Sequence, residues 1–221
     1  MDYLKVLRAM CDNCESFNKF MHKPTKSSFA DFIVDETDEY DDFTIVYESR
    51  ELIVHCTHGA TKAVLHIDDD LNVIKIGFTE FKINHAVREY NVFKEAKRSS
   101  IDRFFVPCEY IGEIFGNPIF KMDFVEVDEE KVTSDVWSRC SDSMSDDEIS
   151  EMLDYDDGVV DALFPYYYGS ECELLFDFIS SFDINDLHTG NIGYDADGNI
   201  KLVDYSGYIP RFTETAWHND Y

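Results

Sequence analysis

The chain has 221 residues, of which 44% are hydrophobic and 15% aromatic, so it can bury one sizeable core or two small lobes around a cleft. Its 46 acidic and 19 basic residues give a formal net charge of −27 at pH 7, which would repel nucleic acid and anionic membranes. No run approaches the roughly 18 apolar residues of a membrane-spanning helix, so we expect a cytoplasmic protein that contacts neither nucleic acid nor membrane directly.

The N-terminal segment, residues 1–42, predicts one helix followed by an acidic linker. Apolar side chains recur near a 3.6-residue period over residues 2–22, which is typical of an amphipathic helix that ends before Pro24. Residues 23–42 are polar and acidic and favour a linker. Cys11 and Cys14 could begin a zinc site, but a tetrahedral site needs two further ligands, so we expect two small helix residues. The other cysteines are scattered, as is typical of reduced thiols.

The middle of the chain predicts an antiparallel sheet and one helix. Turn sequences THGAT and DDDLN separate short β-type runs, which predict strands at 43–47, 52–56, 63–67 and 73–78. A helical pattern follows at 83–98, and strand character returns at 104–112 and 118–127.

The last third predicts helices and a closing hairpin. After an acidic, serine-rich stretch at 128–147, residues 148–182 have helical spacing, broken by FPYYYGS. Residues 191–194 and 200–205, joined by DADG, predict a hairpin.

Three oxygen-bearing side chains flank this predicted hairpin, within the segment FDINDLHTGNIGYDADGNIKLVDYSG. Asp186 and Asn191 lie five residues apart before the first strand, and Asp204 lies thirteen residues beyond Asn191 at the end of the second. A hairpin brings its two ends together, so these groups could supply hard oxygen ligands to Mg²⁺, which one or two carboxylates plus substrate phosphates usually hold. Whichever of the three side chains does not bind the metal could then accept a proton.

The spacing resembles the catalytic loop and metal-binding loop of the protein kinase superfamily. The wording DLHTGN is similar to aminoglycoside-phosphotransferase-like and other atypical kinases. NVIKIGF and HTGNI look like the small serine/threonine kinases that some bacteriophages express to modify host proteins. The resemblance implies an α+β, two-lobed kinase-like fold: an N-lobe at 43–127 with an antiparallel sheet and one helix, and a truncated, mainly helical C-lobe at 128–221.

The resemblance also implies roles for five residues of an ATP and Mg²⁺ site. Lys75 would contact the α- and β-phosphates while paired to Glu89 on the following helix. Asp204 and Asn191 would bind the metal. Asp186 would orient the acceptor hydroxyl and take its proton.

Weaker assignments complete the implied nucleotide site. His188 could contact the γ-phosphate in place of a lysine. Gly59 would lie in a reduced glycine-rich loop, where Lys62 could compensate by touching phosphate. The strand FKMDFVEV resembles the one that leads into the kinase hinge, so backbone groups near Asp123 and Val125 would receive an adenine edge.

The sequence also departs from the family pattern. The His-Arg pair that usually precedes the catalytic aspartate is Ile184-Asn185, and Tyr205 follows the metal-binding aspartate in place of phenylalanine. Only fourteen residues follow Gly207, so we expect the late helices of the usual peptide platform to be missing. Taken singly, each site residue also has an ordinary structural explanation, such as turn formation for Asp204 or a surface charge for Glu89.

Three functions therefore stay in competition. The first is phosphoryl transfer to serine or threonine of host proteins. The second is a non-catalytic, acidic kinase-like protein that binds and inhibits a host enzyme, possibly as a nucleic-acid mimic. The third, suggested only by the DLHTGN wording, is phosphorylation of a small molecule. The sequence leaves the oligomeric state open.

Overall fold

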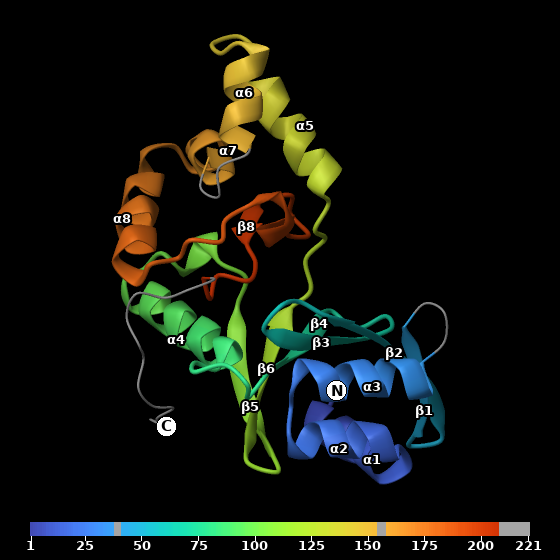
Figure 1. Ribbon diagram of the computed structural model, residues 1–221. Helices are drawn as coiled ribbons and strands as arrows, with labels where there is room; N and C mark the ends of the chain where they lie inside the picture. Colours follow the sequence, from blue (N-terminus) through green and yellow to red (C-terminus); the bar gives the residue numbers. More distant parts are fainter. Residues whose placement is uncertain (38–40, 154–157, 208–221) are drawn as a thin grey trace. The chain divides into compact units, whose positions relative to one another are not determined.

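The computed structural model in Figure 1 describes residues 1–37, 41–153 and 158–207, which form an α+β fold with a six-stranded antiparallel sheet and a small two-stranded hairpin. The α-helices are α1 Tyr3–Asn13, α2 Glu15–His22, α3 Lys26–Glu36, α4 His85–Arg98, α5 Glu129–Cys140, α6 Asp146–Leu153, α7 Gly158–Tyr168 and α8 Cys172–Phe182. The strands are β1 Asp42–Tyr47, β2 Arg50–His58, β3 Lys62–Ile67, β4 Asn72–Gly77, β5 Cys108–Ile114, β6 Asn117–Asp123, β7 Ile192–Tyr194 and β8 Ile200–Leu202. Among the described residues, no helix is long and apolar enough to cross a membrane.

The described residues divide into two compact units. The first contains residues 1–90 and 108–124, and the second contains residues 91–107 and 125–207. Helix α4 contributes its first turns to one unit and its last turns to the other. Residues 208–221, expected at the end of the C-lobe, lie outside the described residues.

The sheet of the first unit has the strand order β1-β2-β3-β4-β6-β5. Strands β1 to β4 form a meander, and the register of β3 and β4 pairs Leu65 with Ile74 and Val64 with Lys75. Because side chains alternate between the two faces of a strand, Leu65 and Ile74 share one face, while Val64 and Lys75 share the other. The predicted strands at 43–47, 52–56, 63–67 and 73–78 are confirmed to within a few residues.

One face of this sheet is covered by the N-terminal helices (Figure 1), which form one hydrophobic core with it. Phe29 and Phe32 of α3 are completely buried in this core. Thr25 starts α3 with a capping box, in which its side chain accepts from the backbone N–H of Ser28 and the Ser28 hydroxyl accepts from that of Thr25. The prediction of a linker is therefore wrong for residues 26–36, because the acidic surface of this helix hides two core phenylalanines.

The predicted helix at 2–22 is in fact two helices. Cys14 has an extended backbone between α1 and α2, and its Sγ accepts a hydrogen bond from the N–H of Phe17 at 3.3 Å. Cys14 therefore caps the second helix rather than lying within one. Cys11 and Cys14 are both buried free thiols.

The second unit contains the helices α5–α8 and the hairpin of β7 and β8. Phe105 is at its centre, with its ring 4.9 Å from that of Tyr205 and 5.7 Å from that of Phe178. The backbone of Val106 donates to the Leu202 carbonyl at 3.0 Å, which ties this segment to β8. The hairpin is confirmed with strands of three residues each.

One helix prediction in the second unit is wrong, and another is confirmed in part. Helix α5 forms within the acidic stretch that showed no helical pattern, because Val132, Val136 and Cys140 recur every four residues and are buried. The break predicted at FPYYYGS occurs at its last residues, because helix α7 continues through Pro165 to Tyr168 and a 3-10 turn at Gly169–Glu171 then separates it from α8. The Tyr168 ring packs at 4.7 Å from that of Phe104, so tertiary packing outweighs the local cost of proline. The strand expected from residue 104 begins only at Cys108.

Candidate functional site

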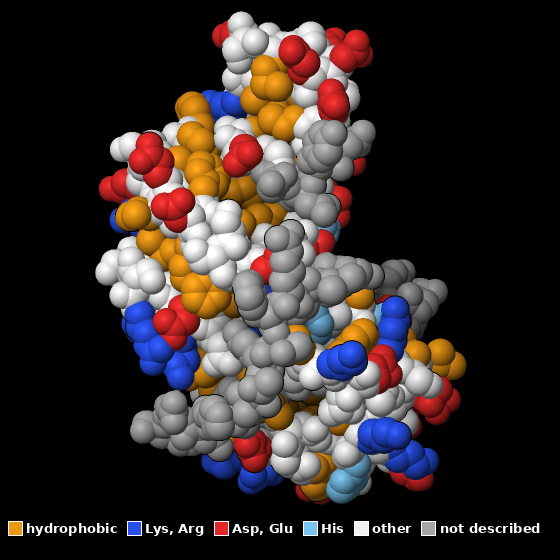
Figure 2. All heavy atoms as spheres, turned by 60° about the vertical axis from the view of Figure 1, so that its left-hand side comes forward, with side chains coloured by type: hydrophobic (Ala, Val, Ile, Leu, Met, Phe, Trp, Pro, Cys, Tyr) orange, Lys and Arg blue, Asp and Glu red, His pale blue; other side chains and the backbone are white. Residues whose placement is uncertain are grey.

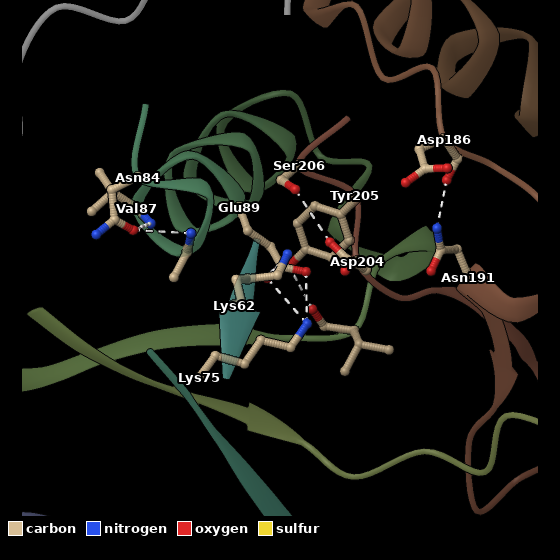
Figure 3. A network of polar contacts seen from close by, with 12 residues as sticks. Lys62, Lys75, Asn84, Val87, Glu89, Asp186, Asn191, Asp204, Tyr205 and Ser206 are labelled. Carbon is tan, nitrogen blue, oxygen red and sulfur yellow. Dashed lines mark hydrogen bonds and ion pairs between the residues drawn. The ribbon is translucent and has the colours of Figure 1, made fainter. Parts of the chain in front are cut away.

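The first group of site residues is a buried ion pair between strand β4 and helix α4. The Lys75 Nζ lies 2.9 Å from Oε1 of Glu89 and 3.1 Å from Oε2 (Figure 3). Relative exposure is 4% for Lys75 and zero for Glu89, so both charges are removed from water. Such burial is tolerated only where charges are paired, which makes this pair a fixed part of the first unit.

The start of helix α4 is fixed by Asn84 and Gly77. The Asn84 Oδ1 accepts from the backbone N–H groups of Ala86 and Val87, each at 3.1 Å, and so caps the helix (Figure 3). A Cβ at Gly77 would overlap this same side-chain amide. Gly77 therefore lets the helix cap pack against the end of β4, two residues beyond Lys75, and the cap sets where Glu89 falls five residues later.

Lys62 is the residue whose position differs most from expectation. It is the first residue of β3 rather than part of a mobile loop, and it is 1% exposed. Its Nζ lies 3.4 Å from Oε2 of Glu89 (Figure 3). The Glu89 carboxylate thus contacts two buried lysines from neighbouring strands.

The other expected nucleotide-binding residues of this region are more exposed. Gly59 lies in the turn before β3 and has open space around it. Asp123 is the exposed last residue of β6, and the half-buried Val125 follows two residues later. Between them, the backbone N–H of Phe124 donates to the Leu71 carbonyl at 2.8 Å. That donor is therefore engaged within the first unit, and adenine binding near Asp123 and Val125 stays a prediction.

The second group of site residues lies in the loop before β7. The Asn191 side-chain amide donates to the backbone carbonyl of Asp186 at 2.8 Å (Figure 3). His188 lies between them: its Nε2 is 3.6 Å from Oδ1 of Asp186 and 3.2 Å from Nδ2 of Asn191. The backbone N–H of Gly190 donates to the His188 Nδ1 at 3.1 Å. The Nε2 is thus the ring nitrogen that faces both Asp186 and Asn191.

Asp204 is held beside this loop by the hairpin. The N–H of Val203 donates to the Asn191 carbonyl at 2.8 Å, which places Asp204 one residue from a direct contact with the Asn191 backbone. Asp204 has a left-handed backbone with φ of 50°, and the Ser206 hydroxyl donates to its Oδ1 at 3.2 Å (Figure 3). Left-handed residues other than glycine cluster at functional sites, where the surrounding structure enforces them.

The residues that follow Asp204 show how this backbone is enforced. Tyr205 is completely buried, and its hydroxyl donates to the Val106 carbonyl at 2.7 Å. Gly207 has φ of 70°, and a Cβ there would lie 2.8 Å from the carbonyl oxygen of Asp183. Asp204 thus lies between the Val203 N–H, which is bound to Asn191, and the buried Tyr205.

This second group fits a cation that phosphates help to hold. The Asn191 Nδ2 is engaged by the Asp186 carbonyl, which leaves Oδ1 as the oxygen that this amide can offer a metal. Asp204 supplies a carboxylate nearby in the chain. No group of three or more His, Cys, Asp or Glu side chains suited to a metal occurs within 1–37, 41–153 and 158–207. A cation here would therefore depend on ligand oxygens for the rest of its coordination, as Mg²⁺ often does.

The structure thus brings the predicted residues together in two groups. Lys75, Glu89 and Lys62 meet in the first unit, whereas Asp186, His188, Asn191 and Asp204 belong to the second. That the two groups face one another across a cleft stays a prediction. Sequence reasoning missed Gly77 and Asn84, although a glycine at a strand end and an asparagine just before a helix are both recognisable signals.

No protein-family model matches the chain, and no curated protein matches it.

Proposed function

We propose that this protein transfers the γ-phosphoryl group of ATP to serine or threonine hydroxyls of proteins, using a kinase-like arrangement of two lobes. The observation that carries the proposal is the buried pair of Lys75 and Glu89. The family resemblance implies this pairing of a strand lysine with a helix glutamate fourteen residues later. A strand lysine paired to a helix glutamate is the arrangement that positions the phosphate-binding lysine in protein kinases.

The chain's own residues would share the work of the reaction. Lys75, held by Glu89, would bind the α- and β-phosphates, and Asn191 and Asp204 would hold Mg²⁺. The metal would neutralise the charge that develops on the phosphate oxygens. Asp186 would orient the acceptor hydroxyl and accept its proton as the new oxygen–phosphorus bond forms. The bond to the bridging β-phosphate oxygen breaks, and ADP leaves with that electron pair.

The geometry suggests a different role for His188 from the expected contact with the γ-phosphate. Its Nδ1 is occupied by the Gly190 N–H and its Nε2 points at Asp186, so the ring links the loop backbone to the proposed base. We assign His188 as a positioning residue that orients Asp186. Phosphoryl transfer depends chiefly on positioning, so such a contact would affect the rate.

Under this proposal the first unit corresponds to the N-lobe and the second to an abbreviated C-lobe. The sheet with helix α4 supplies the phosphate-binding lysine, and the loop with the β7–β8 hairpin supplies the base and the metal ligands. The looser resemblance to phage kinases further suggests a phage-encoded protein acting on host proteins in the host cytoplasm.

The test is a transfer assay with γ-labelled ATP, Mg²⁺ and a bacterial lysate, comparing the full chain with Asp186→Asn. We expect the label on lysate proteins, or on the chain itself, to fall by about 10²-fold or more, which is typical when a general base is removed. Asp197→Asn is a matched control, because Asp197 is an exposed turn residue between β7 and β8. Equal labelling by the two variants would mean that another protein carries the activity.

The net charge of −27 supports a second candidate, an acidic protein that inhibits a host enzyme. On the face drawn in Figure 2, the acidic side chains lie in separate groups with lysines and arginines among them, rather than in one continuous surface. A failure to bind ATP, together with capture of a host protein at low salt and its release at high salt, would favour this candidate.

A further inference from the structure

The turn between β2 and β3 is short. Strand β2 ends at His58 and β3 begins at Lys62, and the Gly59 N–H donates to the Lys62 carbonyl at 3.1 Å. A glycine-rich loop binds phosphate by presenting several backbone N–H groups at close range. Here the Gly59 N–H closes the turn, and Gly59 is the only glycine among the turn residues 59–61. Phosphate contacts from this part of the sheet must therefore come mainly from side chains.

Lys62 and Lys75 lie on the same face of the sheet. In the β3–β4 register, Val64 is opposite Lys75, and Lys62 is opposite Gly77. Residues two apart on a strand share a face, so the two lysines are diagonal neighbours across adjacent strands. Gly77 has no side chain that could separate them. The opposite face is the one packed against the N-terminal helices.

The Glu89 carboxylate holds the two amines together. Lys75 contacts both of its oxygens, at 2.9 and 3.1 Å, whereas Lys62 contacts Oε2 alone at 3.4 Å. The pair of Lys75 and Glu89 is therefore the tighter one, and an anion that binds Lys62 would compete with its longer contact to Glu89. Because all three side chains are almost completely buried, the amines are positioned before any ligand arrives.

We propose that Lys62 is a second phosphate-binding lysine of this site, so that two ammonium groups on adjacent strands take the place of a glycine-rich backbone loop. The ligand is a nucleoside polyphosphate. Lys75 binds the phosphates while paired to Glu89, and Lys62 binds further phosphate oxygens from the neighbouring strand. The assignment rests on the proposed function, because it places a second contact in the same nucleotide site.

The experiment measures binding of MgATP to the full chain by calorimetry. We expect Lys62→Met to weaken binding at least tenfold, since it removes the ammonium but keeps the length and apolar stem. Lys62→Arg retains a cation and should recover most of the affinity. Lys19→Met is the matched control, because Lys19 is an exposed lysine of the first unit that forms an ion pair with Glu15 four residues earlier. The affinity of this variant for MgATP should equal that of the wild type.

The outcomes separate this assignment from the proposed function. If wild type and Lys62→Met bind MgATP equally, Lys62 is not a phosphate ligand, while the kinase proposal stands. If Lys62→Met and Lys62→Arg weaken MgATP binding equally, the role of Lys62 is packing and the assignment is overturned. If the wild type binds no MgATP, the proposed function fails and this assignment fails with it. Hydrogen exchange of the β3 and β4 amides would show that ligand-free Lys62→Met is folded if its rates equal those of the wild type.

Discussion

Replacing Glu89 by glutamine should destabilise the first unit by about 3–5 kcal/mol, the usual cost of removing one partner from a buried ion pair. The side chains of Lys75 and Lys62 are only 5% and 2% exposed, so little water replaces the lost carboxylate charge around either amine. Most of the loss comes from Lys75, which makes two hydrogen bonds within 3.1 Å. Lys62 adds less, because its contact with Glu89 is longer, at 3.4 Å.

Hydrogen exchange of the β3 and β4 amides is the appropriate assay, because the two units can open separately and one global unfolding curve would mix them. At 1.4 kcal/mol per tenfold change, the expected loss accelerates exchange by roughly 10²-fold to 10³-fold. Amides of α5 and α7 in the second unit are the internal reference. Their exchange should change little.

A double variant tests whether the loss arises from the ion pair. Lys75→Met in the Glu89→Gln background removes the ammonium that the first change leaves buried, so the double variant should be more stable than the sum of the two single losses predicts. We expect a coupling of about 1–3 kcal/mol. Losses that simply add, or a Glu89→Gln cost below about 1 kcal/mol, would refute the reasoning, because surface ion pairs behave that way.

Two further changes test the supports around the site. Gly77→Ala should destabilise the first unit by about 2 kcal/mol, because its Cβ displaces the Asn84 cap of α4, and exchange at the start of α4 should report it. Partial burial lowers the pKa of His55, but hydrogen bonds and charges of Asp42 and Asp68 outweigh it and raise the pKa above 6.5. The stability that His55 contributes relative to His55→Gln is therefore full below about pH 6.5 and is lost as the pH rises through the folded-state pKa, which melting temperatures between pH 5.5 and 8.5 would show.

Matched controls exist for both changes. Gly59→Ala introduces the same methyl group into open space and should leave stability nearly unchanged. His58→Gln removes an exposed histidine of the same strand, whose Nδ1 contacts the Gly59 carbonyl and whose ring packs near Phe29 and Phe78. If either control matched its test variant, the assigned cause would be wrong.

Local patterns were enough to locate the strands of the meander and helix α4. Period-two alternation and turn residues define β1 to β4, and a helical period defines α4. The ion pair of Lys75 and Glu89 came from the family resemblance, since alternation alone does not say which face of β4 the helix covers. The pairing of Asp186 with Asn191 came from the same source, and the observed contact is through a backbone carbonyl that no sequence pattern specifies.

Helices α3 and α5 were missed because their surfaces are acidic. In α3 only a few residues are buried, and Phe29 and Phe32 are spaced three apart among charged neighbours. In α5 the buried positions are Val132, Val136 and Cys140, and the exposed residues between them give the segment the composition of a loop. A net charge of −27 forces acidic residues onto helix faces, so in this chain acidity is a poor guide to linkers.

The face of the sheet on which Lys62 lies depends on the length of one turn, which amino-acid composition does not specify. In the observed register, Lys62 shares the face of Lys75, and its neighbour Ala63 faces the core with the N-terminal helices. A shift of one residue between β3 and β4 would exchange the two faces and send the lysine toward that core. The turn at residues 68–71, between β3 and β4, sets this register and so brings a second lysine to Glu89. Lengthening that turn by one residue should thus impair phosphate binding even though every proposed ligand is retained.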